Sequence, residues 1–216
     1  MKIQTYPIAA AAIAGLFIVS CAENPADNTP SAEVSDPTEE SASTTEPAPA
    51  GETTSYEFTE ESTIGFVGSK VTGSHEGGFK KFSGSFSVAD GKPGPGPHKI
   101  EIDMTSTWSD AEKLTGHLKS PDFFDVEKFP TSAFKVTNVE EAEGENAYTL
   151  SGDFTLHGVT KKISFPATVK NADGKVMLDA EFDINRKDFG IVYPGKPDDL
   201  IRDEVVIKLA MVAEAE

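Results

Sequence analysis

The sequence from Tyr56 to the C-terminus predicts an all-β domain of about eight or nine antiparallel strands, either a closed barrel or a sandwich. Three observations lead to this prediction. Apolar and polar residues alternate with period two in one run after another, as in strands that bury one face. Asp-Gly and related turn signals separate the runs, and Asp-Gly between alternating segments is a strong hairpin signal. Helical patterning interrupts the strands once, near residues 109–130.

Each expected strand is defined by its alternating apolar residues. The runs cover residues 64–66, 86–88, 100–104, 134–136, 148–156, 163–169, 176–184 and 205–211. Hairpin turns are expected at the ADGK of residues 89–92, the EGEN of 143–146, the HGVT of 157–160 and the second ADGK of 172–175. We expect His157 to have a structural role in its turn.

The helical segment is predicted from a capping pattern. Ser109 and Glu112 have the spacing of a capping box, with Ser at the N-cap and Glu at the third helical position. Leu114 and Leu118 follow four residues apart and would share a helix face. Pro121 favours the start of a further short turn. A helical excursion between two strands is where a barrel would carry a lid or plug.

Residues 1–20 are predicted to be a signal peptide. Lys2 supplies a positive charge, and the uncharged apolar run of residues 8–19 is shorter than the about 20 residues that span a bilayer. The run ends in IVSC, which resembles the lipobox of bacterial lipoproteins. This resemblance implies that Cys21 becomes the first mature residue and carries acyl chains, which together form a stable membrane anchor. An ordinary secreted protein with an unrelated cysteine is the alternative.

Residues 21–55 are predicted to be the lipidated cysteine and a disordered acidic linker. The segment is rich in Pro, Ser, Thr and Glu and contains no Lys or Arg, so it has too little apolar surface to offset its ordering entropy. As a flexible coil it would span roughly 30 Å between the anchor and the domain of residues 56–216. Ala22 after the cysteine favours the outer membrane in a Gram-negative cell. The predicted location is therefore exported and membrane-anchored, on the periplasmic face.

Composition excludes several classes of function. The net charge of −17 argues against nucleic acid, because phosphate contacts need Lys and Arg. The single cysteine allows no internal disulfide and no zinc site built from several thiolates. The four histidines are scattered, with no HExxH, and no G-x-S-x-G nucleophile elbow is present. We therefore predict neither a catalytic centre nor a metal nor a cofactor.

Four separated stretches carry a family resemblance. They are GGFKKFSGSF (77–86), LTGHLKSPDFFDVEKFPTSAF (114–134), LSGDFTLHGVTKKISF (150–165) and INRKDFGI (184–191). In this order and spacing the domain resembles the YceI-like family of lipid- and polyisoprenoid-binding proteins. The resemblance implies a lipocalin-like antiparallel barrel of about eight strands, whose internal cavity holds an isoprenoid or another long-chain amphiphile. The GKPGPGPH of residues 91–98 does not match the pattern.

Large apolar side chains near the helical excursion, and some on strands, are the candidate ligand contacts. They are Phe82, Trp108, Leu114, Leu118, Phe123, Phe124 and Phe129, with Phe66, Phe154 and Phe182 on strands. Each could instead pack the core. Burying ten carbons of a slim tail would contribute on the order of 8 kcal/mol before the cost of ordering it.

The sequence thus predicts a membrane-anchored lipoprotein that binds an isoprenoid or similar amphiphile. A ligand-free scaffold module of the cell envelope is the alternative, with the barrel filled by its own side chains. An enzyme acting on a lipid would need a polar dyad inside the pocket, which the sequence does not indicate. A homodimer is left open.

Overall fold

The computed structural model describes residues 22–37, 53–94 and 96–215 and consists mostly of strands. The predicted signal peptide, Cys21 and residues 38–52 of the predicted linker lie outside the described residues. The strands are β1 (Glu33–Ser35), β2 (Thr53–Phe58), β3 (Thr63–Lys70), β4 (Gly73–Phe79), β5 (Phe82–Ala89), β6 (Lys92–Pro93), β7 (Lys99–Asp103), β8 (Thr107–Ser109), β9 (Thr131–Glu141), β10 (Ala147–Leu156), β11 (Val159–Ala172), β12 (Lys175–Asn185), β13 (Gly195–Lys196) and β14 (Asp199–Ala215). The helices are α1 (Glu112–Lys119) and the 3₁₀ turns η1 (Pro25–Asn28), η2 (Met104–Ser106) and η3 (Arg186–Phe189).

Several of these strands are collinear pieces of longer ones. β2 and β3 pair with successive parts of β14, with Phe58 opposite Ala213 and Thr63 opposite Ala210. In the same way, β4 and β5 form one long strand, in which β5 pairs with β2 and β4 pairs with β3. β7 and β8 form the next one, in which β7 pairs with β5 and β8 pairs with β4. The result is eight long antiparallel strands, each paired with its neighbours in the chain.

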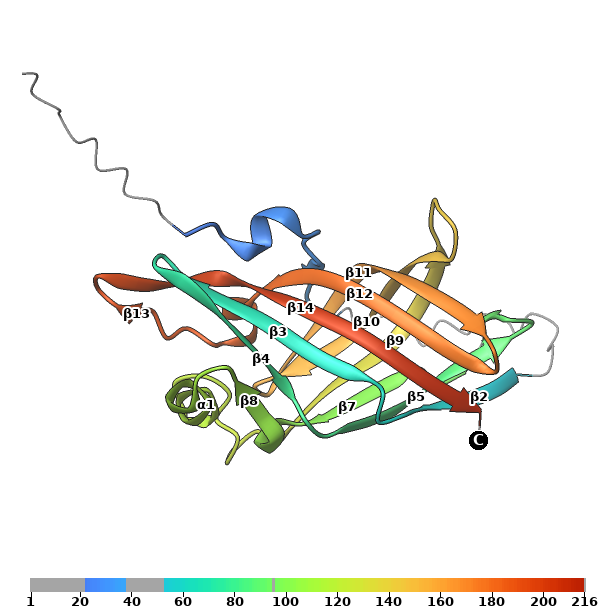
Figure 1. Ribbon diagram of the computed structural model, residues 1–216, viewed down its shortest axis with the longest axis horizontal. Helices are drawn as coiled ribbons and strands as arrows, with labels where there is room; N and C mark the ends of the chain where they lie inside the picture. Colours follow the sequence, from blue (N-terminus) through green and yellow to red (C-terminus); the bar gives the residue numbers. More distant parts are fainter. Residues whose placement is uncertain (1–21, 38–52, 95, 216) are drawn as a thin grey trace, which may run out of the picture.

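The last strand closes the sheet. β14 pairs with β12 along one edge and with β2 and β3 along the other, so the sheet forms the closed barrel seen in Figure 1. Closure removes the open edges on which other chains could pair. The prediction of an antiparallel barrel of about eight strands with a helical excursion is confirmed.

Two-residue hairpins join neighbouring strands at the predicted Asp-Gly and His-Gly turns. In each, both central residues have positive φ, as a type I′ turn requires. These pairs are Asp90-Gly91, His157-Gly158 and Asp173-Gly174. The structural role expected for His157 is confirmed, and its ring also lies 4.7 Å from that of Phe129.

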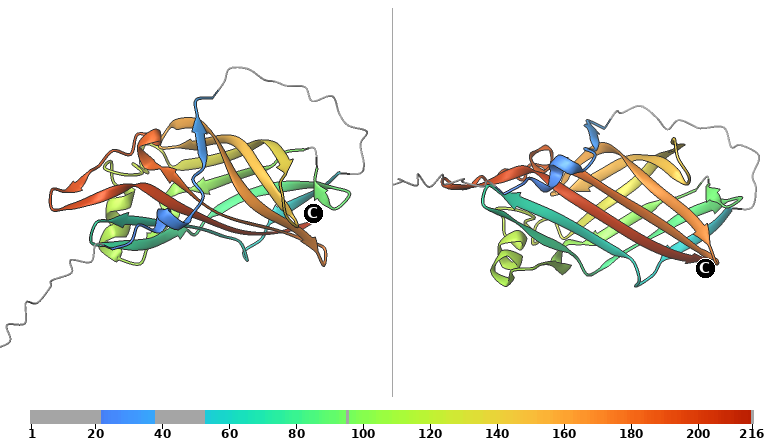
Figure 2. Two further views of the ribbon diagram at one scale, coloured as in Figure 1. Left: turned by 90° about the horizontal axis from the view of Figure 1, so that it is seen from above. Right: turned by 45° about the horizontal axis from the view of Figure 1, so that its top comes forward.

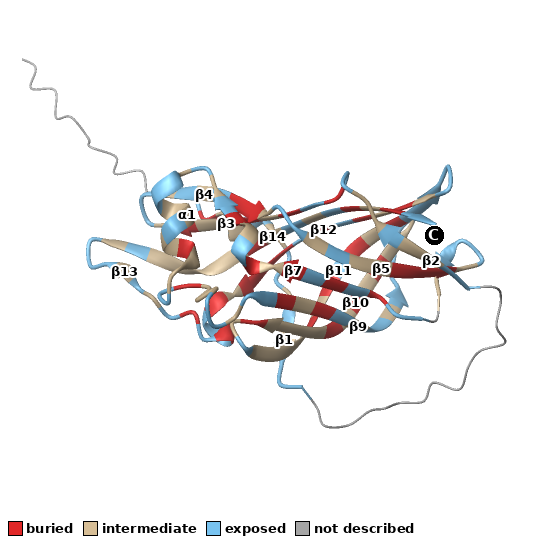
Figure 3. Ribbon diagram, turned by 90° about the horizontal axis from the view of Figure 1, so that it is seen from below, coloured by how far each residue is buried: buried red, intermediate tan, exposed pale blue. Residues whose placement is uncertain are grey.

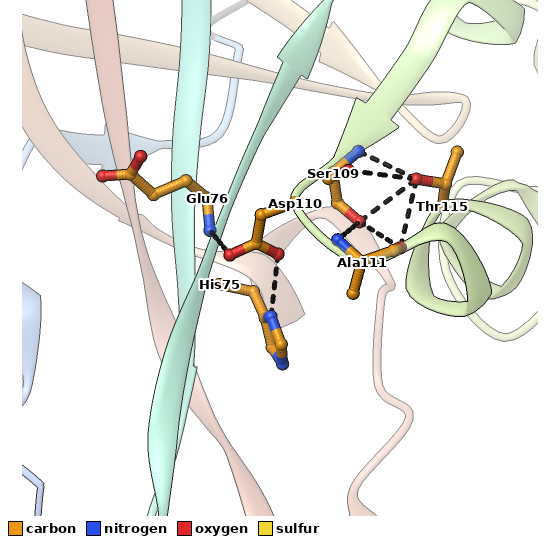
Figure 4. Close-up of polar contacts among 6 residues, drawn as sticks. All are labelled: His75, Glu76, Ser109, Asp110, Ala111 and Thr115. Atoms are coloured by element: carbon orange, nitrogen blue, oxygen red, sulfur yellow. Dashed lines mark hydrogen bonds and ion pairs between the residues drawn. The ribbon is translucent and has the colours of Figure 1, made fainter.

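The start of α1 differs from the predicted capping box. Ala111 is the N-cap residue and makes no side-chain capping bond. Ser109 instead ends β8, opposite Gly77. The Thr115 hydroxyl reaches back from the first turns of the helix and accepts a 2.9 Å hydrogen bond from the Ser109 amide, as Figure 4 shows. The strand pairing of Ser109 therefore overrides its local capping signal, and Glu112 lies in the first turn.

The barrel is packed solid at the β2 end. Phe165 stacks on Phe182 with ring centroids 4.0 Å apart, and Phe165 contacts Phe134 at 5.4 Å. A residual space of about 20 Å³ lies beside Phe134 and Phe165. Buried residues recur along the strands of the barrel (Figure 3).

Residues 22–37 are part of the barrel, so the prediction of a disordered linker is wrong for them. β11 pairs with β12 only through residues 168–172. β1 pairs with β11 beyond that point, with Val34 opposite Ile163. On the other side, the Ala32 amide donates to the Asp183 carbonyl of β12 at 2.9 Å. The segment therefore fills the gap where β11 and β12 diverge (Figure 2). Backbone groups of β11 and β12 that do not pair with each other form hydrogen bonds with residues 22–37 and stabilise this segment. The composition of the segment does not indicate such contacts.

Candidate functional site

A cavity of about 260 Å³ occupies the barrel end that carries α1. Side chains from the strands, from η3 and from the helical excursion line it, and most are apolar. The apolar lining consists of Phe66, Phe79, Ile102, Met104, Leu114, Leu118, Phe123, Phe124, Phe154, Leu156, Ile184, Ile191, Ile201, Val205 and Ile207. The barrel is thus solid at one end and hollow at the other.

The helical excursion forms one wall of the cavity. After α1, residues 120–129 make tight turns, with the Phe123 and Asp125 amides both donating to the Ser120 carbonyl. These turns direct Phe124 against two strand residues, 6.2 Å from the Phe66 ring and 5.9 Å from the Phe79 ring. The excursion, which connects β8 to β9, therefore contributes aromatic side chains to the cavity wall.

A glycine in β4 makes room for this aromatic group. A Cβ added at Gly77 would lie 2.4 Å from the Phe66 ring and 2.6 Å from the Trp108 carbonyl oxygen. The position therefore has no space for a side chain. Gly77 belongs to the GGFKKFSGSF stretch, so part of that motif has a packing function beside the cavity.

Six of the predicted ligand contacts line the cavity. They are Phe66, Leu114, Leu118, Phe123, Phe124 and Phe154. The other four do not. Phe82 and Trp108 line a neighbouring depression beside Lys80 and Lys208. Phe129 packs against His157 in the turn between β10 and β11, and Phe182 is part of the solid core.

Sequence reasoning missed the polar part of the lining. It contains four basic residues, Lys70, His75, Arg186 and Arg202, and no Asp or Glu. Three of them are paired with nearby carboxylates outside the lining: Lys70 with Asp199, His75 with Asp110 at 2.8 Å, and Arg186 with Asp203 at 3.1 Å. The hydrogen bond from Lys70 lowers the pKa of Asp199. Figure 4 shows how the His75 contact joins β4 to the start of the excursion.

Arg186 is buried and almost fully bonded within the protein. Its Nη1 donates to the Ile191 carbonyl at 2.7 Å, its Nε to the Arg202 carbonyl at 3.1 Å, and its Nη2 to an Asp203 carboxylate oxygen at 3.1 Å. Burial lowers the pKa of this guanidinium, while Asp203 and Glu204 oppose the shift. Arg186 therefore ties η3 to the start of β14. Its place in the INRKDFGI stretch was the one signal in the sequence that pointed to it.

Arg202 is bonded less completely. Its Nη2 donates to the Ala22 carbonyl at 2.7 Å, but its Nε is shielded from solvent without a hydrogen-bond partner among the described residues. The described residues also place no carboxylate within ion-pair distance of it. A buried donor without an acceptor is costly.

No helix in residues 22–37, 53–94 and 96–215 is both long and apolar enough to cross a membrane. Within the same residues, no cluster of three or more His, Cys, Asp or Glu side chains could hold a metal ion.

An antiparallel barrel of eight strands around an apolar cavity is the architecture of lipocalin-like barrels. A sequence model of the YceI-like domain matches residues 56–213. The chain therefore belongs to the YceI-like family, which confirms the resemblance seen in the sequence.

Relatives and solved structures agree with this assignment. A UPF0312 protein of Pseudomonas putida strain KT2440 is 35% identical over 153 residues, covering 65% of this chain and 78% of the relative. Burkholderia cenocepacia BcnA has 26% identity and a TM-score of 0.63, over 70% of this chain and 96% of that one. A polyisoprenoid-binding domain from Saccharophagus degradans has the same fold, with 18% identity and a TM-score of 0.61 over 76% of this chain and all (100%) of that one.

Proposed function

We propose that the protein binds the hydrocarbon chain of an isoprenoid or another long-chain amphiphile in its barrel cavity. The observation that carries the proposal is the contrast between the two barrel ends, about 260 Å³ of apolar space against about 20 Å³. The larger volume lies just below the range of roughly 300–1,000 Å³ typical of ligand pockets, and it suits a slim chain. The described polar groups of the lining mostly bond to protein groups outside the lining, which favours binding over catalysis.

The proposal includes attachment to a membrane through a lipidated Cys21. Ala22, the next residue, bonds to Arg202 in the cavity lining. A lipid anchor at Cys21 would therefore hold the hollow end of the barrel close to the bilayer, whereas a flexible linker would leave it roughly 30 Å away. Ligand would then have a short path between membrane and cavity.

Solvent extraction of the purified, folded protein followed by mass spectrometry tests the binding function. We expect a co-purified long-chain lipid, or uptake of added polyprenol by protein that has been stripped of lipid. Repeated absence of both would contradict the proposal. Metabolic labelling with a radioactive fatty acid tests the anchor, since label should enter the wild-type protein but not the Cys21→Ser variant.

The solid packing of the β2 end favours a second candidate, a ligand-free scaffold of the cell envelope. This reading predicts that the protein takes up no lipid and co-purifies with a stable protein partner. The extraction experiment therefore separates the two functions.

A further inference from the structure

We propose that the cavity selects amphiphiles with an anionic head group, a phosphate or a carboxylate, and that Arg202 binds this group. The inference rests on the proposed binding function and names the ligand class of the same site. In a chain of net charge −17, the cavity lining carries four basic residues and no acidic one.

Three of the four basic groups already have anionic partners. Lys70 pairs with Asp199, His75 with Asp110, and Arg186 with Asp203. These pairs hold β3, β4 and η3 in place, and they leave little charge for a ligand. Arg202 has no such partner among the described residues, so its charge in the cavity wall is not offset by a nearby carboxylate.

The Arg202 guanidinium is only partly bonded within the protein. One end of the Arg202 guanidinium is fixed by the Ala22 carbonyl, at 2.7 Å from Nη2, while Nε is buried without an acceptor. A guanidinium presents its N–H groups as a planar fork that matches the two oxygens of a carboxylate or phosphate. An anionic oxygen bound to this fork would neutralise its charge.

The apolar lining completes the binding mode. Arg202 comes from the start of β14, whereas Phe154 and Leu156 come from the end of β10 and lie in the same cavity. A ligand with its head at Arg202 would therefore lay its tail along the apolar strand residues and the excursion. The cavity has the composition expected of a site for an amphiphile, with many apolar groups and few polar ones that fix orientation.

Pairs of ligands that share a tail and differ in the head group test the proposal. The probes are geranylgeranyl phosphate against geranylgeraniol, and palmitate against hexadecanol, measured by equilibrium dialysis with lipid-stripped protein. We expect the anion of at least one pair to bind about tenfold or more tightly than its alcohol, as a charge-assisted hydrogen bond predicts. A preference in the first pair alone indicates a lipid phosphate, and in the second alone a fatty acid.

Variants test whether Arg202 causes the preference for anionic head groups. Arg202→Gln should reduce it to about twofold or less while the alcohols still bind. Lys187→Gln, which removes the same charge from an exposed side chain outside the cavity lining, should leave it intact. If Arg202→Gln does not fold, Arg202→Lys keeps the charge without the fork and should lower the preference. An unchanged preference in the folded Arg202 variant contradicts the assignment.

The two failures are distinguishable. Equal binding of alcohols and anions by the wild-type protein overturns the head-group proposal and leaves the proposed function standing. Failure of all four probes to bind counts against the proposed function itself.

Discussion

The carbonyl oxygen of Ala22 accepts a 2.7 Å hydrogen bond from Nη2 of Arg202, 180 residues later in the chain. This contact joins the residue next to the predicted lipidation site to the wall of the cavity. Two further bonds hold the same segment, from the Ser69 hydroxyl to Asn24 at 3.4 Å and from the Ser31 hydroxyl to Asp183 at 2.8 Å. The first residues after Cys21 are therefore a structural part of the hollow end.

Replacing Asn24 should measure how strongly this segment is attached. Asn24 is buried, and its Oδ1 accepts from the Ala26 amide at 3.3 Å as the N-cap of η1. We expect Asn24→Ala to lower the free energy of unfolding by about 1 kcal/mol, the usual cost of losing such a cap, measured by urea denaturation. Asn28→Ala is the control, because Asn28 is exposed at the end of the same turn. Equal effects of the two changes would show that the segment is loosely attached.

Arg186 and Lys187 donate to the same carboxylate and differ in burial. Lys187 reaches Asp203 at 2.7 Å from an exposed position, whereas the Arg186 side chain is 5% exposed. Arg186→Met would leave the Ile191 and Arg202 carbonyls without a donor. We expect this substitution to lower the free energy of unfolding by about 3 kcal/mol, as when other buried ion pairs lose one partner.

Lys187→Met should lower the free energy of unfolding by at most about 1 kcal/mol, the usual contribution of a surface ion pair. Denaturation of the two variants and the wild type under one condition provides the measurement. Similar losses for both variants would contradict the structural role assigned to Arg186.

Gly77 and Gly73 lie in the same strand and should respond differently to a methyl group. A Cβ at Gly77 would clash with Phe66 and with the Trp108 carbonyl, while nothing lies within 4 Å of one at Gly73. Gly77→Ala should therefore destabilise the barrel by about 1–3 kcal/mol, the range for overpacking. Gly73→Ala should change stability by less than about 1 kcal/mol. Thermal unfolding of the pair checks this, and a neutral Gly77→Ala would show that both the Phe66 ring and the Trp108 carbonyl can move aside.

Local signals predicted the barrel well because hairpins are local. The Asp-Gly and His-Gly turns and the period-two alternation each depend on residues close in sequence. The same alternation identifies which side chains point inward, but not how far along the barrel axis they lie. Phe154 and Phe182 are both on strands and directed inward, yet one lines the cavity and the other stacks in the solid core. That difference depends on strand register, which is a property of the closed sheet.

Non-local contacts explain the other departures. Composition predicted disorder for residues 22–37, but their stabilisation comes from unpaired backbone groups of β11 and β12. Ser109 has the sequence of an N-cap, but its strand pairing with β4 decides its conformation. The basic residues of the cavity follow no periodic pattern, because η3, β3, β4 and β14 meet only in the folded chain.

His98 should give the protein a stability that depends on pH. Its Nδ1 accepts from the Ser87 amide at 3.1 Å and its Nε2 lies 2.9 Å from the Gly94 carbonyl, so the ring is neutral with the proton on Nε2. Burial lowers the pKa of His98 from its ordinary value of 6.5. The unfolded chain therefore binds more protons than the folded one in the window below pH 6.5, and stability falls as the pH drops through it.

Urea denaturation at about pH 7.5 and about pH 5.5 brackets this window above the range where most carboxylates titrate. The slope contributed by one such group is at most about 1.4 kcal/mol per pH unit. His98→Gln keeps a donor and an acceptor without a titrating ring, and it should lose less stability than the wild type between the two pH values. Parallel pH profiles for the wild type and His98→Gln would exclude the role of His98.

Filling the cavity should weaken ligand binding without unfolding the barrel. Val205 is half-buried and lines the hollow end, so an indole at this position would occupy space that a tail needs. The cavity can take much of the added volume, and we expect Val205→Trp to cost no more than about 1–3 kcal/mol of stability. Binding of polyprenol should weaken at least about tenfold, because several carbons of the tail can no longer be buried, at about 0.8 kcal/mol each.

Val192→Trp makes the same substitution at a side chain that is 62% exposed and should bind as the wild type does. Unimpaired binding by a folded Val205→Trp protein would place the ligand elsewhere, because a slim chain cannot share about 260 Å³ with a tryptophan side chain.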